Sequence, residues 1–549
     1  MNCLCSKHNY CVLLILSLPV SAQSQFNLNG QIEVDNTYQQ LKTRSSDSRN
    51  LNTLSVTPSI NTSYDSKTFR GIWSGSLVHL SRERNDLNLT DTFAEYNYSA
   101  NWRPYGDILT FKATGFLNFI NANNANFLLS DFLNNSQDLV KTRSNRLSSA
   151  FVLNRNNWIN VGAEASFSDT ASESSRFTNN NALNNDSVSF SGNLTNGRSL
   201  ENISFEFKGS YQKTEREQAG FGDFITRQGD FFSDFKLYSD FALRLTAFHE
   251  GNQVSSDLDS SSVVRQFNSY GVGLTYRQNE TRYISITSNK IASQDGNIDD
   301  ESSDKSFIGL DMQWALSSRT SMRAKYGRRF FGESASAQFS YNSKFFRSSF
   351  NYSEDVTNTS RLLANQENLG VFVCPSNSLS ISDCFQPNSL SYSPLANERL
   401  VQLSGQNIDL QYNIIVRKAG NLQAGYDFSR VTLAFSWGYS EDNFIEFERL
   451  RRTFSFGSQL SFQVGKNTVF NASADIANIL EKSEPGLPNG EADNYKTSFG
   501  VRRDIGQNLV VNFDFTFLKQ EGDEITGLSQ FGSNFTDRRM SISLVYRYD

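Results

Sequence analysis

The sequence predicts an all-β fold: a transmembrane antiparallel outer-membrane β-barrel with about 24 strands (range about 20–26), short periplasmic turns and long extracellular loops. Three observations indicate this fold class. Apolar and polar residues alternate along most of the 549-residue chain, short turns alternate with long polar connections, and only 38% of the residues are hydrophobic although 13% are aromatic. Because lipid contacts only every second residue of a strand, such a barrel needs no long apolar runs.

The first element is an export signal at residues 1–22. Lys7 precedes a short apolar core at 11–20, and Val20, Ser21 and Ala22 form a small-residue cleavage site. The core is about ten residues long, too short to cross a bilayer as a helix, and an ordinary buried helix is the alternative. Cleavage after Ala22 would leave residues 23–549 as a single barrel domain in the outer membrane of a Gram-negative bacterium.

A period of two runs through the rest of the chain. Successive side chains of a strand point to opposite faces, so this period gives each strand one apolar and one polar face. The clearest strands are Phe26–Val34, Leu54–Tyr64, Ile159–Phe167, Ile203–Tyr211, Val431–Tyr439, Leu509–Phe517 and Met540–Tyr548. The last one is typical of the terminal strand that the barrel-assembly machinery recognises, although Asp549 follows its final aromatic residue.

The connections alternate between short and long, as they do in outer-membrane barrels. Short turns are predicted at 65–67, 103–107, 154–157, 277–281, 342–344, 427–430, 465–467 and 504–507. Long loops are predicted at 36–50, 120–144, 169–186, 212–229, 289–305 and 353–412. The pattern is least regular at 405–426. A soluble β-sandwich is the alternative, but no domain break divides the chain, and only closure pairs every strand edge in lipid.

Charged residues within the predicted strands indicate which face lines the lumen. A charge on the lipid-facing side costs about 2–4 kcal/mol at the bilayer midplane, so these residues should point inward. The predicted lumen charges are Glu33, Glu164, Glu206, Asp311, Arg323, Lys325, Lys496, Arg502 and Asp514. They either pair with one another or form charged rings that set pore selectivity. Arg328 and Arg329 are predicted near the outer rim.

Few residues predict chemistry. After cleavage only Cys374 and Cys384 remain of the cysteines, and their proximity in an exported chain predicts a disulfide, with free thiols or a metal site as alternatives. His79 and His249 have no cluster of metal-ligating residues around them, and the acidic segment 295–304 lacks the spacing of a calcium loop. We therefore predict no catalytic site, no metal and no cofactor. The net charge of -6 argues against a nucleic-acid partner.

The segment 326–359, "YGRRFFGESASAQFSYNSKFFRSSFNYSEDVTNT", resembles a block of the outer-membrane β-barrel family associated with the PEP-CTERM/exosortase system. Residues 56–60 and 155–167 are similar to that family too. The matching features are strands and turns, so no functional residue is transferred. The resemblance implies a role in exopolysaccharide production or protein sorting at the outer membrane, with outer-membrane lipid, polysaccharide and other export-system components as partners.

Three functions fit these features. The first is a channel or accessory pore for a polymer or solute, because a barrel of this size encloses a wide lumen. The second is a non-transporting scaffold or a surface-binding barrel that acts through its loops, and the third is a general solute porin. An open or a plugged lumen distinguishes them, and the sequence does not give the transported substrate or the oligomeric state.

Overall fold

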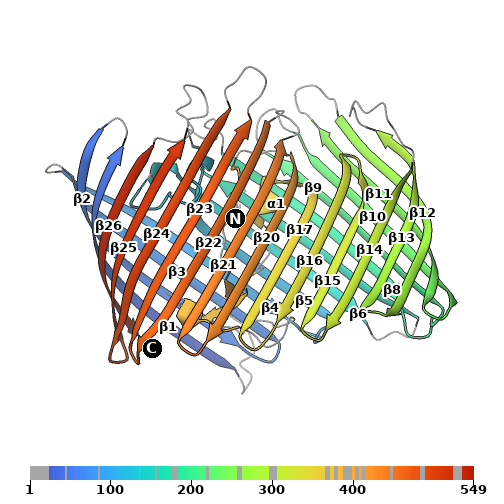
Figure 1. The fold of residues 1–549 in the computed structure, drawn as a ribbon, viewed down its shortest axis with the longest axis horizontal. Coiled ribbons are helices and arrows are strands. Elements are labelled where there is room, and N and C mark those ends of the chain that lie inside the picture. Colours follow the sequence, from blue (N-terminus) through green and yellow to red (C-terminus); the bar gives the residue numbers. More distant parts are fainter. Residues whose placement is uncertain are drawn as a thin grey trace, which may run out of the picture.

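The fold is seen in a computed structural model (Figure 1). It describes residues 24–43, 46–84, 87–134, 136–154, 158–175, 182–217, 222–255, 262–295, 306–364, 371–375, 381–386, 398–401, 407–410, 414–444, 449–482, 489–522 and 534–548. The predicted export signal and nearly all of the acidic segment 295–304 lie outside these residues. No helix within the described ranges is long and apolar enough to cross a membrane.

Twenty-four antiparallel strands form one closed sheet. The first twelve are β1 (Gln25–Thr43), β2 (Ser46–Asp65), β3 (Phe69–Arg84), β4 (Leu87–Trp102), β5 (Leu109–Asn121), β6 (Leu139–Leu153), β7 (Ile159–Ser172), β8 (Leu183–Asn196), β9 (Ile203–Arg216), β10 (Phe224–Tyr238), β11 (Phe241–Ser255) and β12 (Ser262–Asn279). The others are β13 (Arg282–Asp295), β14 (Ser306–Ser317), β15 (Thr320–Arg329), β16 (Gly332–Asn342), β17 (Phe346–Asn358), β20 (Ile414–Phe428), β21 (Val431–Phe444), β22 (Arg449–Gly465), β23 (Thr468–Lys482), β24 (Gly490–Ile505), β25 (Leu509–Gly522) and β26 (Phe535–Tyr548).

Each strand pairs with the strands that precede and follow it in this ring, and β26 pairs with β1 to close it. Closure gives every strand a ladder partner on both sides over at least part of its length, as a barrel in lipid requires. Strands β17 and β20 are neighbours although residues 359–413 separate them. The prediction of an all-β barrel with about 24 strands is confirmed, because the sheet has 24 strands.

The two ends of the barrel differ in their connections. Tight turns join the strands at one end, which also holds both ends of the ring at Gln25 and Tyr548; we call it the turn end, and it lies at the bottom of Figure 1. The opposite, loop end holds the longer connections. The eight short turns named from the sequence all join strands at this end, as do three further ones at 197–202, 239–240 and 318–319.

The predicted loop at 36–50 is wrong. Strand β1 continues to Thr43, and β2 begins at Ser46, so only two residues separate them. The loops predicted at 169–186 and 212–229 are likewise shorter than expected. Strands that extend beyond the lipid are polar on both faces, so their sequence loses the alternation while their backbone ladder continues.

An apolar belt covers the outer face of the wall near the turn end. On β26 the outward side chains from Tyr548 to Met540 are all hydrophobic, and Ile542 is 53% exposed. The next outward residue toward the loop end is Arg538, which is also exposed. On β7 the outward series from Ile159 to Phe167 ends in the same way at Asp169. This belt is the surface that lipid covers in an outer-membrane barrel.

Candidate functional site: the filled lumen

The segment between β5 and β6, residues 122–138, folds into the lumen. Its short 3₁₀ helix η1 (Asn124–Asn126) reaches the far wall, where Asn494 of β24 donates to the Ala125 carbonyl at 2.8 Å. Gln520 of β25 donates to the same carbonyl at 3.2 Å. Farther along, Arg539 of β26 forms an ion pair with Asp131 at 2.5 Å. These contacts hold the segment across the interior of the barrel.

The described residues of the connection between β17 and β20, at 359–364, 371–375, 381–386, 398–401 and 407–410, form the second segment in the lumen, whereas we predicted an extracellular loop at 353–412. That prediction is wrong for the residues that the structure describes. The short helix α1 (Thr359–Ala364) reaches across to β8, where Asn185 donates to the Ser360 hydroxyl at 2.7 Å, and both side chains are buried. Asn407 also donates to the Asn124 carbonyl at 3.3 Å, so the two lumen segments contact each other. The apolar residues of this segment are removed from water inside the barrel, which is more favourable than exposing them in an extracellular loop.

Part of this segment lies deep in the barrel, close to the turn end. Its strands β18 (Phe372–Pro375) and β19 (Glu398–Val401) form a small separate sheet, and a disulfide joins Cys374 to Cys384. Asp383 pairs with Arg502 at 2.9 Å, only three residues before β24 ends at its tight turn. Phe372 lies against Gly425, where a side chain would clash with it. We call residues 371–375 and 381–386 the inner plug.

An apolar cluster closes the lumen toward the loop end. It gathers lumen-facing residues of the upper strands and residues of the two lumen segments. The buried members are Ala122, Val140, Leu183, Phe224, Phe267, Phe330, Val356, Leu363, Ile408, Leu410, Ile414 and Val416. We call this set the outer cap. It explains the irregular "NIIV" stretch, because Ile414, Ile415 and Val416 are all buried at the start of β20.

The lumen holds two cavities. The larger, which we call the chamber, has a volume of about 1220 Å³, and the smaller has a volume of about 490 Å³. Asn351 and Ser353 of β17 line both. Serine, threonine and asparagine dominate the chamber wall. The side-chain oxygens of Gln31, Ser59 and Asn118 are buried there without a hydrogen-bond partner among the described residues, which is uncommon for buried polar groups.

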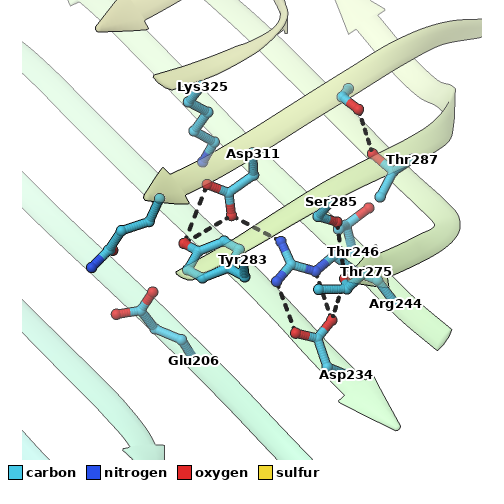
Figure 2. Close-up of polar contacts among 12 residues, drawn as sticks. Glu206, Asp234, Arg244, Thr246, Thr275, Tyr283, Ser285, Thr287, Asp311 and Lys325 are labelled. Carbon is cyan, nitrogen blue, oxygen red and sulfur yellow. Dashed lines mark hydrogen bonds and ion pairs between the residues drawn. The ribbon is translucent and has the colours of Figure 1, made fainter. Parts of the chain in front are cut away.

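A buried ion-pair network forms the wall of the smaller cavity on β10–β14 (Figure 2). Arg244 makes two bonds to Asp234, at 2.6 and 2.8 Å, and a third to Asp311 at 2.8 Å. Arg277 also bonds Asp234 at 2.6 Å, and the Tyr283 hydroxyl donates to Asp311 at 3.3 Å. Arg244 is 1% exposed and Asp234 is 2% exposed. The network fixes five adjacent strands and leaves no unpaired charge at its centre.

All nine predicted lumen charges lie on the strand face opposite the exposed hydrophobic side chains. Most of them have partners of opposite charge. The pairs are Glu164 with Arg146, Glu206 with Lys208, Asp311 with Arg244, Lys325 with Asp230, and Arg502 with Asp383 and Asp504. Lys496 lies directly opposite Asp475 in the ladder. Arg323 donates to Gln313 at 2.7 Å, while Glu33 of β1 and Asp514 of β25, the two strands that flank β26, lie near Ser543 and Asp35.

The two arginines predicted at the outer rim occupy different environments. Arg328 lies opposite Glu333 near the tip of the β15–β16 hairpin. Arg329 points into the lumen, where it bonds Glu250 of β11 at 2.6 Å and Asp355 of β17 at 3.1 Å. Both arginines stand where β15 ends at the loop end, and Arg329 faces the lumen there. The hairpin tip bends inward, and Phe330 joins the outer cap.

The remaining chemistry-bearing residues lie outside the lumen. His79 and His249 occupy the outward faces of β3 and β11, where they bond Thr92 and Asn268. Within the described ranges, no group of three or more His, Cys, Asp or Glu could hold a metal ion. The sequence-based prediction did not include Asp234, Arg244 and Arg277. Each of them is next to an outward-facing residue in its strand, as Arg244 is next to Leu245, so the alternation of faces places all three in the lumen.

These features define the class of the protein: an outer-membrane β-barrel whose lumen is filled by its own chain. No protein-family model and no curated protein matches the sequence. Several solved structures are similar in fold. The FrpB iron transporter (F3-3 variant) from Neisseria meningitidis is 10% identical, with a TM-score of 0.41, over 95% of this chain and 81% of that chain. The siderophore receptor PirA from Acinetobacter baumannii is 9% identical, with a TM-score of 0.40, over 95% and 80%. The copper transporter OprC is 8% identical, with a TM-score of 0.39, over 95% and 81%.

Proposed function

We propose that this protein is a gated transport barrel, in which polar solutes or polymer segments pass through the chamber when the lumen segments move. One observation supports this most directly. The polar chamber of about 1220 Å³ is bounded in part by connecting segments, at Phe127, residues 361–364 and Asn407, in addition to the wall strands. Such segments can shift while every ladder hydrogen bond of the barrel is retained. The serine- and asparagine-rich wall suits hydroxylated ligands, which need many donors and acceptors.

The resemblance of residues 326–359 to the PEP-CTERM/exosortase-associated family supports an exopolysaccharide system as the cellular setting. In this setting the polymer or its fragments would be the transported substrate. Deleting the gene in the native bacterium should reduce the polysaccharide at the cell surface, measured by lectin binding or sugar analysis. An unchanged amount of surface polysaccharide would remove this setting and would leave the gated barrel itself to be tested separately.

The second candidate is a non-transporting scaffold, and the paired lumen charges favour it. Most predicted lumen charges already have partners in the wall or in the lumen segments. Paired charges stabilise a fixed interior and do not need a passing solute. A general solute porin has the least support. A porin of 16–18 strands leaves an open aqueous channel, whereas two segments of this chain occupy the lumen.

Solute efflux from vesicles separates the two candidates. The purified barrel is reconstituted in vesicles loaded with a fluorescent oligosaccharide. In one variant, a short glycine-containing turn replaces 359–413, which is feasible because Asn358 and Ile414 pair directly across β17 and β20. In a second variant, N185C/S360C, a short bis-methanethiosulfonate reagent added during refolding bridges α1 to the wall at a contact of 2.7 Å.

The transport proposal requires slow efflux through the wild type, loss of efflux in the bridged variant and recovery after reduction. Wild-type barrels treated with the same reagent and reductant are the matched control, because reduction also opens the Cys374–Cys384 disulfide. The turn variant should release the oligosaccharide several-fold faster and so prove that the barrel is inserted. Efflux through the turn variant alone, with the wild type as tight as the bridged barrel, would reject transport and favour the scaffold.

A further inference from the structure

The wall has a seam between β4 and β5. Their ladder runs from Trp102 and Phe111 to Tyr96 and Leu117, and it ends there. Both strands continue toward the loop end: β4 extends back to Leu87 and stays paired with β3, while β5 extends to Asn121 and stays paired with β6. Residues Leu87–Glu95 therefore have a ladder partner on one side only. The barrel is closed below this point and unzipped above it.

The seam begins inside the apolar belt. Leu77 of β3 pairs with Ala94, which precedes the last β4–β5 ladder residue, Tyr96, by two positions. Leu77 still points outward there, with 42% of its surface exposed. An unpaired backbone edge at this depth is unfavourable, because lipid offers no hydrogen-bond partner. A seam in this position therefore needs either a permanent cover or a partner that enters it.

Aromatic side chains from three different segments fill the seam. The Phe132 ring, from the lumen segment 122–138, stacks on Phe93 of β4 with the ring centroids 4.3 Å apart. It also lies edge-on to Phe119 of β5 at 5.7 Å, and Phe93 and Phe119 themselves are 5.0 Å apart. Arg82 of β3 donates to the Phe132 carbonyl and holds the loop in place. The Phe119 amide, which has lost its ladder partner, donates to the Glu95 carboxylate at 3.3 Å.

A second divergence in the same wall is closed differently. The β16–β17 ladder ends at Ser336 and Ser353, and above it Arg329 donates to the Glu354 carbonyl at 3.0 Å. There a charged side chain of the wall satisfies the free backbone. At the β4–β5 seam Glu95 of the wall likewise accepts from the Phe119 amide, but the edge is in addition covered by the Phe132 ring, which comes from the connection between β5 and β6. This difference favours a seam that opens over one that is only an irregularity of the sheet.

The chamber opens onto both edges of this seam. Its lining includes Glu95, Tyr96 and Asn97 of β4 together with Phe116, Leu117 and Asn118 of β5. The buried Asn118 oxygen, which has no partner in the described part of the chain, lies at this edge. A ligand in the seam would thus have apolar rings and lipid on one side and a polar, hydroxyl-rich chamber on the other.

We propose that the β4–β5 seam is a lateral portal between the chamber and the outer leaflet, and that it admits an amphiphile with a hydroxylated head, a glycolipid. The head enters the chamber, the acyl chains stay in the membrane, and Phe132 moves aside. This inference deepens the proposed function and rests on it, because it gives the transport chamber a membrane entrance and a substrate class.

Photocrosslinking tests the portal. The photoreactive residue p-benzoylphenylalanine replaces Phe116, at the chamber side of the seam, in barrels held in vesicles that contain lipopolysaccharide. The same replacement of Phe167, outward on β7 and 46% exposed, reports contact with bulk lipid. Replacement of Ser455, which lines the chamber on β22, reports any nonspecific entry. We expect lipid adducts at Phe116 and Phe167 and none at Ser455.

Adding F132A should raise the adduct yield at Phe116 several-fold and leave the yield at Phe167 unchanged. Vesicles of phosphatidylcholine alone should give several-fold less adduct at Phe116, and equal yields would overturn the glycolipid assignment. No adduct at Phe116 with or without F132A, while Phe167 is labelled, would overturn the portal. Oligosaccharide efflux is measured on the same vesicles. Efflux without an adduct rejects only the portal, and an adduct without efflux rejects only the transport of free solutes.

Discussion

Replacing Arg244 by methionine should destabilise the barrel by about 3 kcal/mol, because it leaves Asp234 as a buried carboxylate with half its partners. Removing one member of a buried ion pair costs about 3–5 kcal/mol. The lower end applies here, since Asp234 keeps Arg277 at 2.6 Å and the Thr275 hydroxyl at 3.0 Å. Methionine retains much of the side-chain volume that packs on the Phe232 ring, which lies 4.2 Å from the guanidinium carbon.

The other member of the network should matter much less. Asp311 is 26% exposed on its side chain, so D311N leaves Arg244 paired with Asp234 and should cost below about 1 kcal/mol. D234N alone should be costly, because it leaves Arg244 buried with a single carboxylate. In the double variant R244M/D234N both charges are gone, and the total loss should be smaller than the sum of the two single losses by about 2 kcal/mol.

Urea titration of the barrel in lipid vesicles measures these changes. The folded fraction is read from the different gel mobilities of folded and unfolded barrels in unheated samples. Additivity of R244M and D234N within about 0.5 kcal/mol would refute the coupling. Equal losses for R244M and D311N would refute the argument that burial, rather than the number of ion pairs, decides the cost.

Three further predictions concern the inner plug and the belt. A side chain at Gly425 would lie 2.6 Å from the Phe372 ring, so G425V should push the plug from the wall and raise efflux several-fold, whereas G192V, where the nearest atom is 3.7 Å away, should not. The C374S/C384S variant should loosen the inner plug by about 3 kcal/mol, the closure entropy of so short a loop, and thus speed its hydrogen exchange while the urea midpoint of the barrel stays fixed. F513R places a charge on the outward face of β25 and should lower the free energy of unfolding by about 2–4 kcal/mol in the same urea titration. The control N512R, one residue away on the lumen face, should lower it by less than about 1 kcal/mol. Equal losses would contradict the assigned faces.

The wall could be predicted from the sequence because its rules are local. Alternation fixes which side chains share a face, and the tight turns fix where the strands end, so the strand number followed from the pattern. The same alternation placed Glu33, Glu164 and Asp514 in the lumen. Applied to the end of β15, it also puts Arg329 on the lumen side with Arg323 and Lys325, which the rim prediction did not state.

The filling of the lumen could not be predicted, because its contacts join residues far apart in the chain. Arg539 pairs with Asp131, and Arg502 pairs with Asp383. No local pattern selects these partners from the many charges available. A weaker signal was present in the many apolar residues of this connection, such as Phe372, Ile408 and Leu410. Such residues would be unfavourable in a loop surrounded by water.

The two closures of the chamber differ in strength, and this difference sets the order in which they open. The outer cap contains large buried side chains such as Phe267, Leu363 and Ile414, and the burial of each stabilises the cap by about 1.5–3 kcal/mol. The inner plug meets the wall through Arg502 and Asp383, and Asp383 is 29% exposed, so this pair contributes about 1 kcal/mol or less. The plug also packs Val371, Phe372 and Cys374 in an apolar cluster with Ala434 of β21, but this cluster has five buried members against twelve in the outer cap. We therefore expect the chamber to open first toward the turn end while the outer cap stays closed. In that state the lateral seam, and not the loop end, would be the route between the chamber and the outer face of the membrane.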